Sequence, residues 1–242
     1  MKLEDLYQKE ITKVNCQNIV ALLPIGAIEV HGEHLPLGTD NFLAVKLAEK
    51  IEYSLGNEKA LVLPLIPYGQ VWSLKEAPGS IHIAEDILSE YIAMISESIA
   101  RMKIKKLAII NSHVGNIGAI RKAARKLYEQ NIIQAFYFTY PGTFHEIEKV
   151  CESPLPHPGY FHACEIETSY MLYLCEEKVK MEKAICQYPN FPPDFDYTPI
   201  PWTKIMDTAV LGDAAKATKE KGKFILDACV ERIVSILRSE KT

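Results

Sequence analysis

Four side chains that can bind a metal ion lie within twelve residues of one another near the start of the sequence. They are Glu29, His31, His34 and Asp40, and they stand among glycines and prolines. In an extended backbone, residues i and i+2 point to the same side, so Glu29 and His31 can address the same point. Carboxylate and imidazole ligands together suit zinc, manganese or non-haem iron. This stretch therefore predicts a metal site rather than a polar loop whose histidines only form hydrogen bonds.

The elements around this stretch predict an α/β fold. The apolar run 19–23 before it predicts a buried strand, and Asp40 comes just before a predicted helix. Strands are further predicted over 60–66, 106–111 and 132–138, and helices over 3–13, 41–54, 85–102, 117–129 and a C-terminal stretch that reaches about 238. This alternation is typical of a single-domain α/β/α sandwich with a mostly parallel sheet. Ligands bind such sheets beyond the carboxyl ends of the strands, which is where the metal-binding stretch is expected.

Two further loops are expected at the same edge of the sheet. One loop, over 67–80, follows the second strand and carries Trp72 and Ser73. Loops of this length usually serve a function, and Trp72 can either stack on a flat substrate or pack against the domain. The other loop follows the third strand and places His113 at its carboxyl end. The convergence of three loops supports a binding site there, with Trp72 and Ser73 as candidate substrate contacts.

Length and composition exclude several classes of protein. The 242 residues suit one large domain, here expected over 1–242, and 48% hydrophobic with 24% charged residues argues against disorder. The net charge of −4 and the lack of a basic run argue against a nucleic-acid partner. No apolar stretch reaches about 18 residues and the N-terminus lacks an apolar signal segment, which favours a cytoplasmic protein without a membrane partner. The six cysteines form no Cys-x-x-Cys pair and are expected to be reduced.

Three segments of the chain carry recognisable motifs. They are Glu29-Val-His-Gly-Glu-His-Leu-Pro-Leu-Gly-Thr-Asp40, Asn111-Ser-His-Val-Gly-Asn116 and His162-Ala-Cys-Glu-Ile-Glu-Thr-Ser169. The first resembles the signature of the creatininase (creatinine amidohydrolase) family, the second its Asn-Gly-His-Gly-Gly-Asn motif, and the third its His-Ala-Gly-Glu-x-Glu-Thr-Ser motif. Similar segments over 78–81 and 212–222 extend the resemblance to nearly the whole chain. The resemblance implies a creatininase-like fold and a metal-dependent hydrolase.

The segment that begins at His162 supplies an imidazole and two carboxylates. If one helix includes all three, His162 and Glu165 lie about 60° apart on one face, while Glu167 is roughly 140° from His162. When His162 faces the site, Glu165 then does so too, and Glu167 serves as a hydrogen-bonding partner or packs elsewhere. This geometry favours Glu165 as the metal ligand, although the choice between the two glutamates stays open.

The candidate ligands are more than a single tetrahedral ion uses once water is included. They are Glu29, His31, Asp40, His113 and Glu165. They suit two divalent ions per chain, zinc and/or manganese or else iron, and the resemblance gives Asp40 the bridging role. His162 is the best placed general acid/base, since it can move a proton from water to a leaving nitrogen, and the resemblance supports this role. His34 and Asn116 are further candidate substrate contacts.

The resemblance also bears on the substrate and on assembly. Relatives include formamide hydrolases and a peptide-trimming enzyme, so we expect hydrolysis of a C–N amide bond in a small cyclic amide, a formamide or a peptide. The alternatives are a metal-dependent hydrolase of a carbohydrate-derived substrate, such as a keto-inositol or a lactone, and a non-catalytic binding protein on this fold. The family implies a homo-oligomer, with a hexamer favoured. The aromatic-rich stretch 187–202 is expected to form a rim of the site or a subunit contact.

Overall fold

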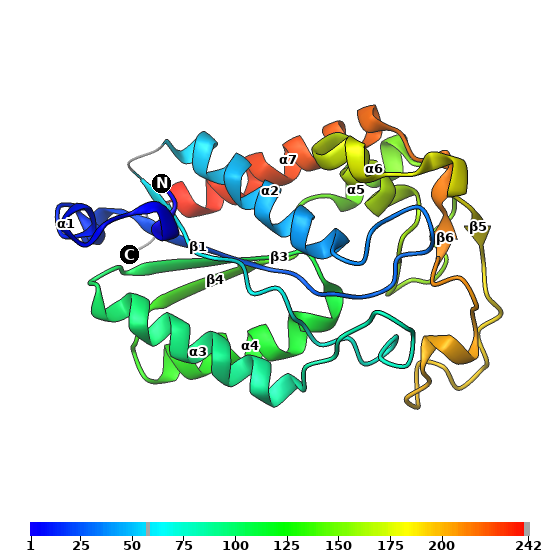
Figure 1. The fold of residues 1–242 in the computed structure, drawn as a ribbon, viewed down its shortest axis with the longest axis horizontal. Coiled ribbons are helices and arrows are strands. Elements are labelled where there is room, and N and C mark those ends of the chain that lie inside the picture. The colour runs from blue at the N-terminus through cyan, green and yellow to red at the C-terminus, as the bar shows by residue number, and fades with distance from the viewer. Residues whose placement is uncertain (57–58, 240–242) are drawn as a thin grey trace.

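The computed structural model describes residues 1–56 and 59–239 of the chain, and its centre is a four-stranded parallel sheet (Figure 1). The strands are β1 (Val20–Ile25), β2 (Ala60–Val62), β3 (Lys106–Asn111) and β4 (Gln134–Phe138). They lie side by side in the order β2-β1-β3-β4, and the register pairs Ile25 with Asn111. The carboxyl ends of the two central strands therefore reach the same edge of the sheet.

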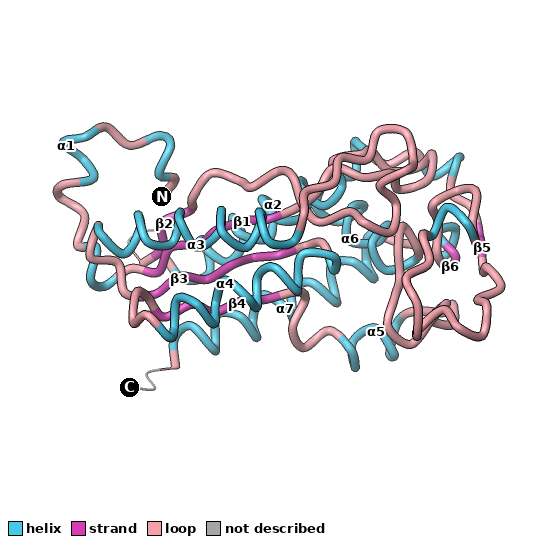
Figure 2. The backbone as a smooth tube through the Cα atoms, turned by 90° about the horizontal axis from the view of Figure 1, so that it is seen from below, coloured by secondary structure: helices cyan, strands magenta, loops and turns pink. Residues whose placement is uncertain are grey.

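Helices cover both faces of this sheet, which confirms the predicted α/β fold with a mostly parallel sheet. α2 (Thr39–Leu55) and α7 (Lys219–Arg238) lie on one face, and α3 (Glu85–Arg101) and α4 (Ile117–Glu129) on the other (Figure 1). α6 (Glu165–Cys175) packs against α2 and α7. The remaining elements include α1 (Gln8–Ile11), α5 (Phe144–Val150) and an antiparallel pair of β5 (Cys186–Gln187) and β6 (Gly212–Asp213). The β5–β6 pair and the long loops gather at the end of the molecule away from the N-terminus (Figure 2).

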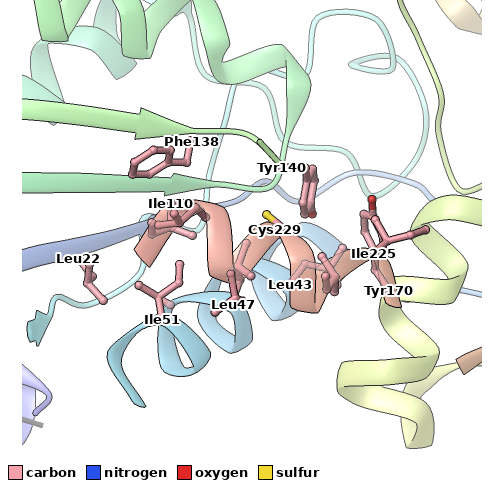
Figure 3. Close-up of a cluster of buried hydrophobic side chains, with 14 of the residues drawn as sticks. Leu22, Leu43, Leu47, Ile51, Ile110, Phe138, Tyr140, Tyr170, Ile225 and Cys229 are labelled. Carbon is pink, nitrogen blue, oxygen red and sulfur yellow. The ribbon is translucent and has the colours of Figure 1, made fainter. Parts of the chain in front are cut away.

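The core consists of two apolar layers, one on each face of the sheet. Successive residues of β1 point to opposite faces. Leu22 accordingly packs in the layer beneath α2 and α7, and Leu23 in the layer beneath α3 and α4. Figure 3 shows Leu43, Leu47 and Ile51 of α2 in the first layer. Because both faces are covered, β1 is buried along its whole length, as its unbroken apolar sequence predicted. The site at the carboxyl edge therefore rests on a rigid base.

Three predicted elements differ from the structure. The helix predicted over 3–13 is a 3-10 turn at Leu3–Asp5 followed by the single turn of α1, because the backbone of Leu6 and Tyr7 between them is extended. The strand predicted over 60–66 ends at Val62, because Pro64 has no N–H to donate to the ladder. The sequence predicted no helix between 138 and 162, where the structure has α5.

Helices α6 and α7 approach each other closely at Gly222. A Cβ atom on this glycine would lie 1.9 Å from the backbone oxygen of Ser169, so only glycine permits the contact. The side-chain oxygen of Ser169 also accepts a hydrogen bond from the N–H of Thr218, which caps the N-terminus of α7. These contacts fix the position of α6, whose first turn bears on the site described below. Among the described residues, 1–56 and 59–239, no helix combines the length and apolar character needed to span a bilayer.

Candidate metal centre

Six buried or nearly buried side chains converge beyond the carboxyl edge of the sheet. They form three overlapping groups: Glu29, Asp40 and His113; His31, Asp40 and Glu167; and Glu29, His31 and His162. Within each group, the potential ligand atoms lie within 4.8 Å of one another. Three carboxylates and three imidazoles at such distances have the donor types that zinc and manganese accept. The structure thus brings together four of the five predicted ligands, and His162 with them.

Asp40 lies at the centre of the cluster, in the first turn of α2. Its Oδ2 atom is 3.2 Å from Nδ1 of His113, and its Oδ1 atom is 3.7 Å from Nε2 of His31. Within the described part of the chain, neither oxygen has a hydrogen-bond partner, although the side chain is 1% exposed. A buried carboxylate without partners costs several kcal/mol unless a cation compensates it. The residues therefore fit a group that places positive charge on both sides of Asp40.

Backbone carbonyls orient the two imidazoles on either side of Asp40. Nδ1 of His31 is 3.1 Å from the carbonyl oxygen of Glu29, and Nε2 of His113 is 2.8 Å from that of Gln70. Because a carbonyl oxygen only accepts, each of these nitrogens donates, and in the neutral imidazole the other ring nitrogen is the one that can bind a metal ion. Nε2 of His31 and Nδ1 of His113 both face Asp40. Metal-binding histidines are commonly oriented by a second contact of this kind.

His162 is held in the same manner on the opposite side of the cluster. Its Nε2 donates to the carbonyl oxygen of Val30 at 2.7 Å, which turns Nδ1 toward Oε1 of Glu29, 3.7 Å away. The centroid of its ring lies 4.2 Å from that of the His31 ring. The planes of the His162 and Trp202 rings make an angle of 69°, which is an edge-on contact. The imidazole is thus fixed with its basic nitrogen toward the cluster.

The sequence favoured Glu165 as the metal ligand, and the structure corrects this prediction. Glu167, and not Glu165, joins the cluster. α6 begins only at Glu165, and His162 lies before it in extended backbone that pairs with Leu211. Between them Ala163 has a φ of +49°. The rotation of 100° per residue therefore does not apply across this segment. Oε2 of Glu167 accepts a hydrogen bond of 2.6 Å from the N–H of Ala163, which directs this carboxylate to the site.

Glu165 instead closes a loop on the other side of α6. Its carboxylate accepts hydrogen bonds from the backbone N–H groups of Glu152 and Ser153 and forms a 2.7 Å ion pair with Lys221 of α7. The side chain is 1% exposed, so these partners take the place of water. Burial opposes its charge, but Lys221 and the hydrogen bonds outweigh this effect and lower the pKa of Glu165. Its contacts are those of a structural anchor for residues 151–153.

Burial and the close spacing of the ionisable groups shift the pKa values of several residues in the cluster. Burial disfavours the ionised form of Glu29, but the imidazoles of His113 and His162 outweigh it and lower the pKa of Glu29 to about 2. Burial also disfavours a charged His113, yet the carboxylates of Glu29 and Asp40 raise the pKa of His113 well above its usual range. Burial raises the pKa of Glu167 to about 7, and Asp40 adds to the shift although His162 opposes it. Divalent cations would replace these shared protons as the compensating charge.

The predicted substrate contacts divide into two kinds. Trp72 and Ser73 line a cavity of about 150 Å³ that Glu29, His113, His162 and Glu167 of the cluster also line, and their role as substrate contacts stays a prediction. Asn116 differs from its prediction: it is fully buried, donates to the carbonyl oxygen of Gly26 and accepts from the N–H of Gln70, so it joins two loops. His34 lies outside the three ligand groups found in residues 1–56 and 59–239, with Nε2 3.0 Å from Oγ1 of Thr168. Burial lowers the pKa of His34 to about 4.

Three aromatic side chains of the cavity wall, Tyr160, Phe161 and Trp202, were not among the predicted site residues. Tyr160 and Trp202 both line the 150 Å³ cavity, and their rings meet edge-on at 5.7 Å. Trp202 comes from the end of the stretch 187–202, for which the sequence indicated a rim or a subunit contact. The aromatic enrichment of that stretch was the available signal, but its local pattern does not identify the residue that reaches the site.

A buried cluster of carboxylates and imidazoles beyond the edge of a parallel α/β sheet defines a candidate metal-binding enzyme. A family model described as creatinine amidohydrolase, or creatininase, matches residues 4–237. The chain belongs to the creatininase family.

The curated relatives cover most of the chain. The creatinine amidohydrolase of Pseudomonas putida is 26% identical over 97% of this chain and 93% of its own. A mycofactocin precursor peptide peptidase of Mycobacterium tuberculosis is 27% identical over 88% of this chain and 83% of its own. A 3-dehydro-scyllo-inosose hydrolase of Thermotoga maritima is 24% identical over 97% of this chain and 82% of its own. These relatives are all hydrolases.

The fold of the chain is also similar to that of a solved creatininase. A solved structure described as "Creatininase Mn" superimposes with a TM-score of 0.80 at 25% identity, covering 98% of this chain and 97% of the other. Family, fold and buried cluster agree, and the chain is an enzyme, a hydrolase of the creatininase family.

Proposed function

We propose that the chain is a metal-dependent amidohydrolase that hydrolyses the C–N amide bond of a small cyclic amide, a formamide or a peptide at a binuclear centre. One observation carries the proposal: Asp40 belongs to two ligand groups at once, and both of its buried oxygens lack hydrogen bonds within the described residues. A carboxylate with one oxygen toward each of two ligand groups is suited to bridging two ions. One ion would be held by Glu29, Asp40 and His113, and the other by His31, Asp40 and Glu167.

The charge of this ligand set supports two divalent ions. Glu29, Asp40 and Glu167 offset three of the four positive charges, which makes burial of the centre far less costly than burial of the carboxylates alone. Zinc and manganese accept the mixed carboxylate and imidazole donors, and iron accepts the same set. The manganese in the description of a solved relative agrees with this choice.

The residues around the ligands have separate tasks in the proposed reaction. When bound, ions of this kind acidify water and polarise a carbonyl group. His162 presents Nδ1 toward the cluster, held there by its bond to the carbonyl of Val30, so as a neutral imidazole it can take a proton and return it to the leaving nitrogen. Trp202 covers one edge of this imidazole and limits the access of bulk water. We therefore assign His162 as the general acid/base.

The purified protein is expected to contain about two divalent ions per chain, mainly zinc or manganese, because two ligand groups share Asp40. Elemental analysis by inductively coupled plasma mass spectrometry measures this content directly. Treatment with a chelator should abolish turnover, and added Zn²⁺ or Mn²⁺ should restore it. A protein that contains no metal and gains neither ions nor activity on their addition would overturn the binuclear proposal.

Substrate class is tested with the same metal-loaded protein. We expect turnover of creatinine, a formamidopyrimidine or a short peptide, because two of the three relatives named above act on substrates with C–N amide bonds. A keto-inositol belongs in the screen because of the third relative. Turnover of the keto-inositol alone would replace the amide proposal by the carbohydrate one.

The predicted assembly is a homo-oligomer, with a hexamer expected. Ile87, Tyr91 and Met94 recur at helical spacing along α3 and are 52–64% exposed, which offers an apolar stripe for a subunit contact. Light scattering coupled to size-exclusion chromatography at micromolar concentration should give a mass several times 27.3 kDa. A mass equal to that of one chain would contradict the prediction.

A further inference from the structure

A second cavity adjoins the one that contains the metal ligands. The inner cavity measures about 150 Å³ and the outer one about 400 Å³. Both are lined by Trp72, Ser73, Tyr160 and Trp202, so the two share a wall of three aromatic side chains and the hydroxyl groups of Ser73 and Tyr160. The inner cavity is thus the smaller of the two by more than half. A substrate much larger than a single small ring would therefore extend into the outer cavity.

The outer cavity is built by the stretch 187–202. The N–H of Trp202 donates to the carbonyl oxygen of Ser73 at 2.8 Å, which ties the end of this stretch to the loop over 67–80. Further out, Phe195 meets Tyr160 edge-on, with ring centroids 6.2 Å apart. Ile200 lies between these anchors in the lining. Aromatic rings thus continue outward from the reaction site, with the polar side chains of Ser73, Asp196 and Thr198 among them.

Charge in the outer cavity favours a substrate group without negative charge. In the described parts of the chain, neither lining contains a lysine or an arginine. The outer cavity instead contains the carboxylate of Asp196, which is 3.2 Å from Nε2 of His157. A carboxylate or phosphate on the substrate would find no cationic side chain there and would meet Asp196. An aromatic or aliphatic group would instead stack on rings that are already in place.

We propose that the outer cavity is a substrate subsite for a flat, uncharged and apolar group attached to the amide that is hydrolysed. The inference rests on the proposed function and narrows its substrate class. The preferred substrate is an extended amide, such as a peptide with an aromatic side chain, with the amide in the inner cavity and the aromatic group in the outer one. A small cyclic amide fills only the inner cavity.

Hydroxamates test the subsite because the hydroxamate group chelates metal ions and places its substituent outside the ligand cluster. The probes are acetohydroxamate, 3-phenylpropanohydroxamate and the monohydroxamate of succinic acid, titrated calorimetrically into the metal-loaded protein. The phenyl probe is expected to bind about tenfold more tightly than acetohydroxamate, which corresponds to about 1.4 kcal/mol. The succinic probe, with its carboxylate, is expected to bind no more tightly than acetohydroxamate.

Two variants locate the effect. Phe195→Ala should remove most of the preference for the phenyl probe and leave the affinity for acetohydroxamate unchanged, because Phe195 lines only the outer cavity. Tyr197→Ala should reduce the preference without affecting the fold, since the Tyr197 side chain is 89% exposed at the same cavity. Tyr128→Ala, at an exposed position of α4, is the matched control and should change neither affinity.

The outcomes separate the subsite from the proposed function. Equal affinities for acetohydroxamate and the phenyl probe, or a preference for the succinic probe, would overturn the subsite and leave the metal centre intact. A phenyl preference that persists in both outer-cavity variants would also overturn it. If no hydroxamate bound the protein after incubation with Zn²⁺ or Mn²⁺, the proposed function would fail, and the subsite with it.

Discussion

Replacement of Glu167 by alanine is expected to lower the metal content from about two ions to about one per chain and to reduce turnover on the order of 100-fold or more. Glu167 is the third member of the group that contains His31 and Asp40, and its carboxylate is directed to the site by the N–H of Ala163. Without it, one ion would lose a ligand and a compensating negative charge. Elemental analysis of the purified variant, together with its turnover rate, measures both effects.

Glu165→Ala is the matched control, since the two glutamates are buried in the same first turn of α6. This variant should retain both ions, because the Glu165 carboxylate contacts Lys221 and the backbone of residues 152–153 instead of the cluster. It should lose stability, by roughly 3 kcal/mol, as expected when one partner of a buried ion pair is removed. Thermal unfolding measures the loss. If Glu165→Ala shed an ion while Glu167→Ala kept both, the roles assigned to the two residues would be reversed.

His162→Ala is expected to keep the fold and both ions and to lose turnover by about 10²–10⁴-fold, the usual effect of removing a general acid/base. Each of the two ligand groups that share Asp40 is complete without His162, whose basic Nδ1 faces Glu29. Metal analysis and single-turnover kinetics on the same preparation distinguish the two effects.

His145→Ala provides the control for this experiment, because His145 lies in α5 with its side chain 82% exposed. It should change neither metal content nor rate. His162 also belongs to a group with Glu29 and His31, in which it would act as a ligand. Loss of an ion from His162→Ala would support that role and contradict the assignment as general acid/base.

Much of the fold could be predicted from the sequence because its strands and long helices carry their own local signals. The continuous apolar run of β1 and the periodic apolar residues of α3 and α4 predicted elements within one to three residues of the observed ends. Once these elements alternate, the handedness and short connections of α/β folds leave few arrangements. The expectation that Glu29, His31, Asp40 and His113 converge follows from that arrangement, since all four stand after strand ends.

The sequence could not exclude Glu165 as a metal ligand, because the wrong prediction arose from the backbone conformation of Ala163, which no local sequence pattern indicates. An alanine rarely adopts positive φ, and nothing in the sequence around Ala163 predicts that conformation. The conformation interrupts the helix between His162 and Glu165 and so changes which carboxylate faces the site. Asn116 is similar: its hydrogen bonds to Gly26 and Gln70 depend on loops that are far apart in the sequence.

The position of Trp202 beside His162 could not be predicted from the sequence for another reason. It depends on the packing of residues 187–202 against the loop over 67–80, more than a hundred positions earlier in the chain. Packing between such distant segments is decided by shape and not by local periodicity. The aromatic residues of the stretch indicated a rim, but only the folded chain identifies Trp202 as the residue that covers His162.

The metal ligands and the outer cavity come from different segments of the chain, which has a consequence for how the enzyme can diverge. The ligands lie on the sheet edge and on the N-terminal turns of α2 and α6, where substitutions disturb the core. Phe195, Tyr197 and Ile200 lie on an irregular surface segment that tolerates substitution and changes in length. Selection can therefore alter the accepted substrate through one surface segment while the reaction chemistry is inherited unchanged, so that orthologues of the same catalytic type can occupy different metabolic roles.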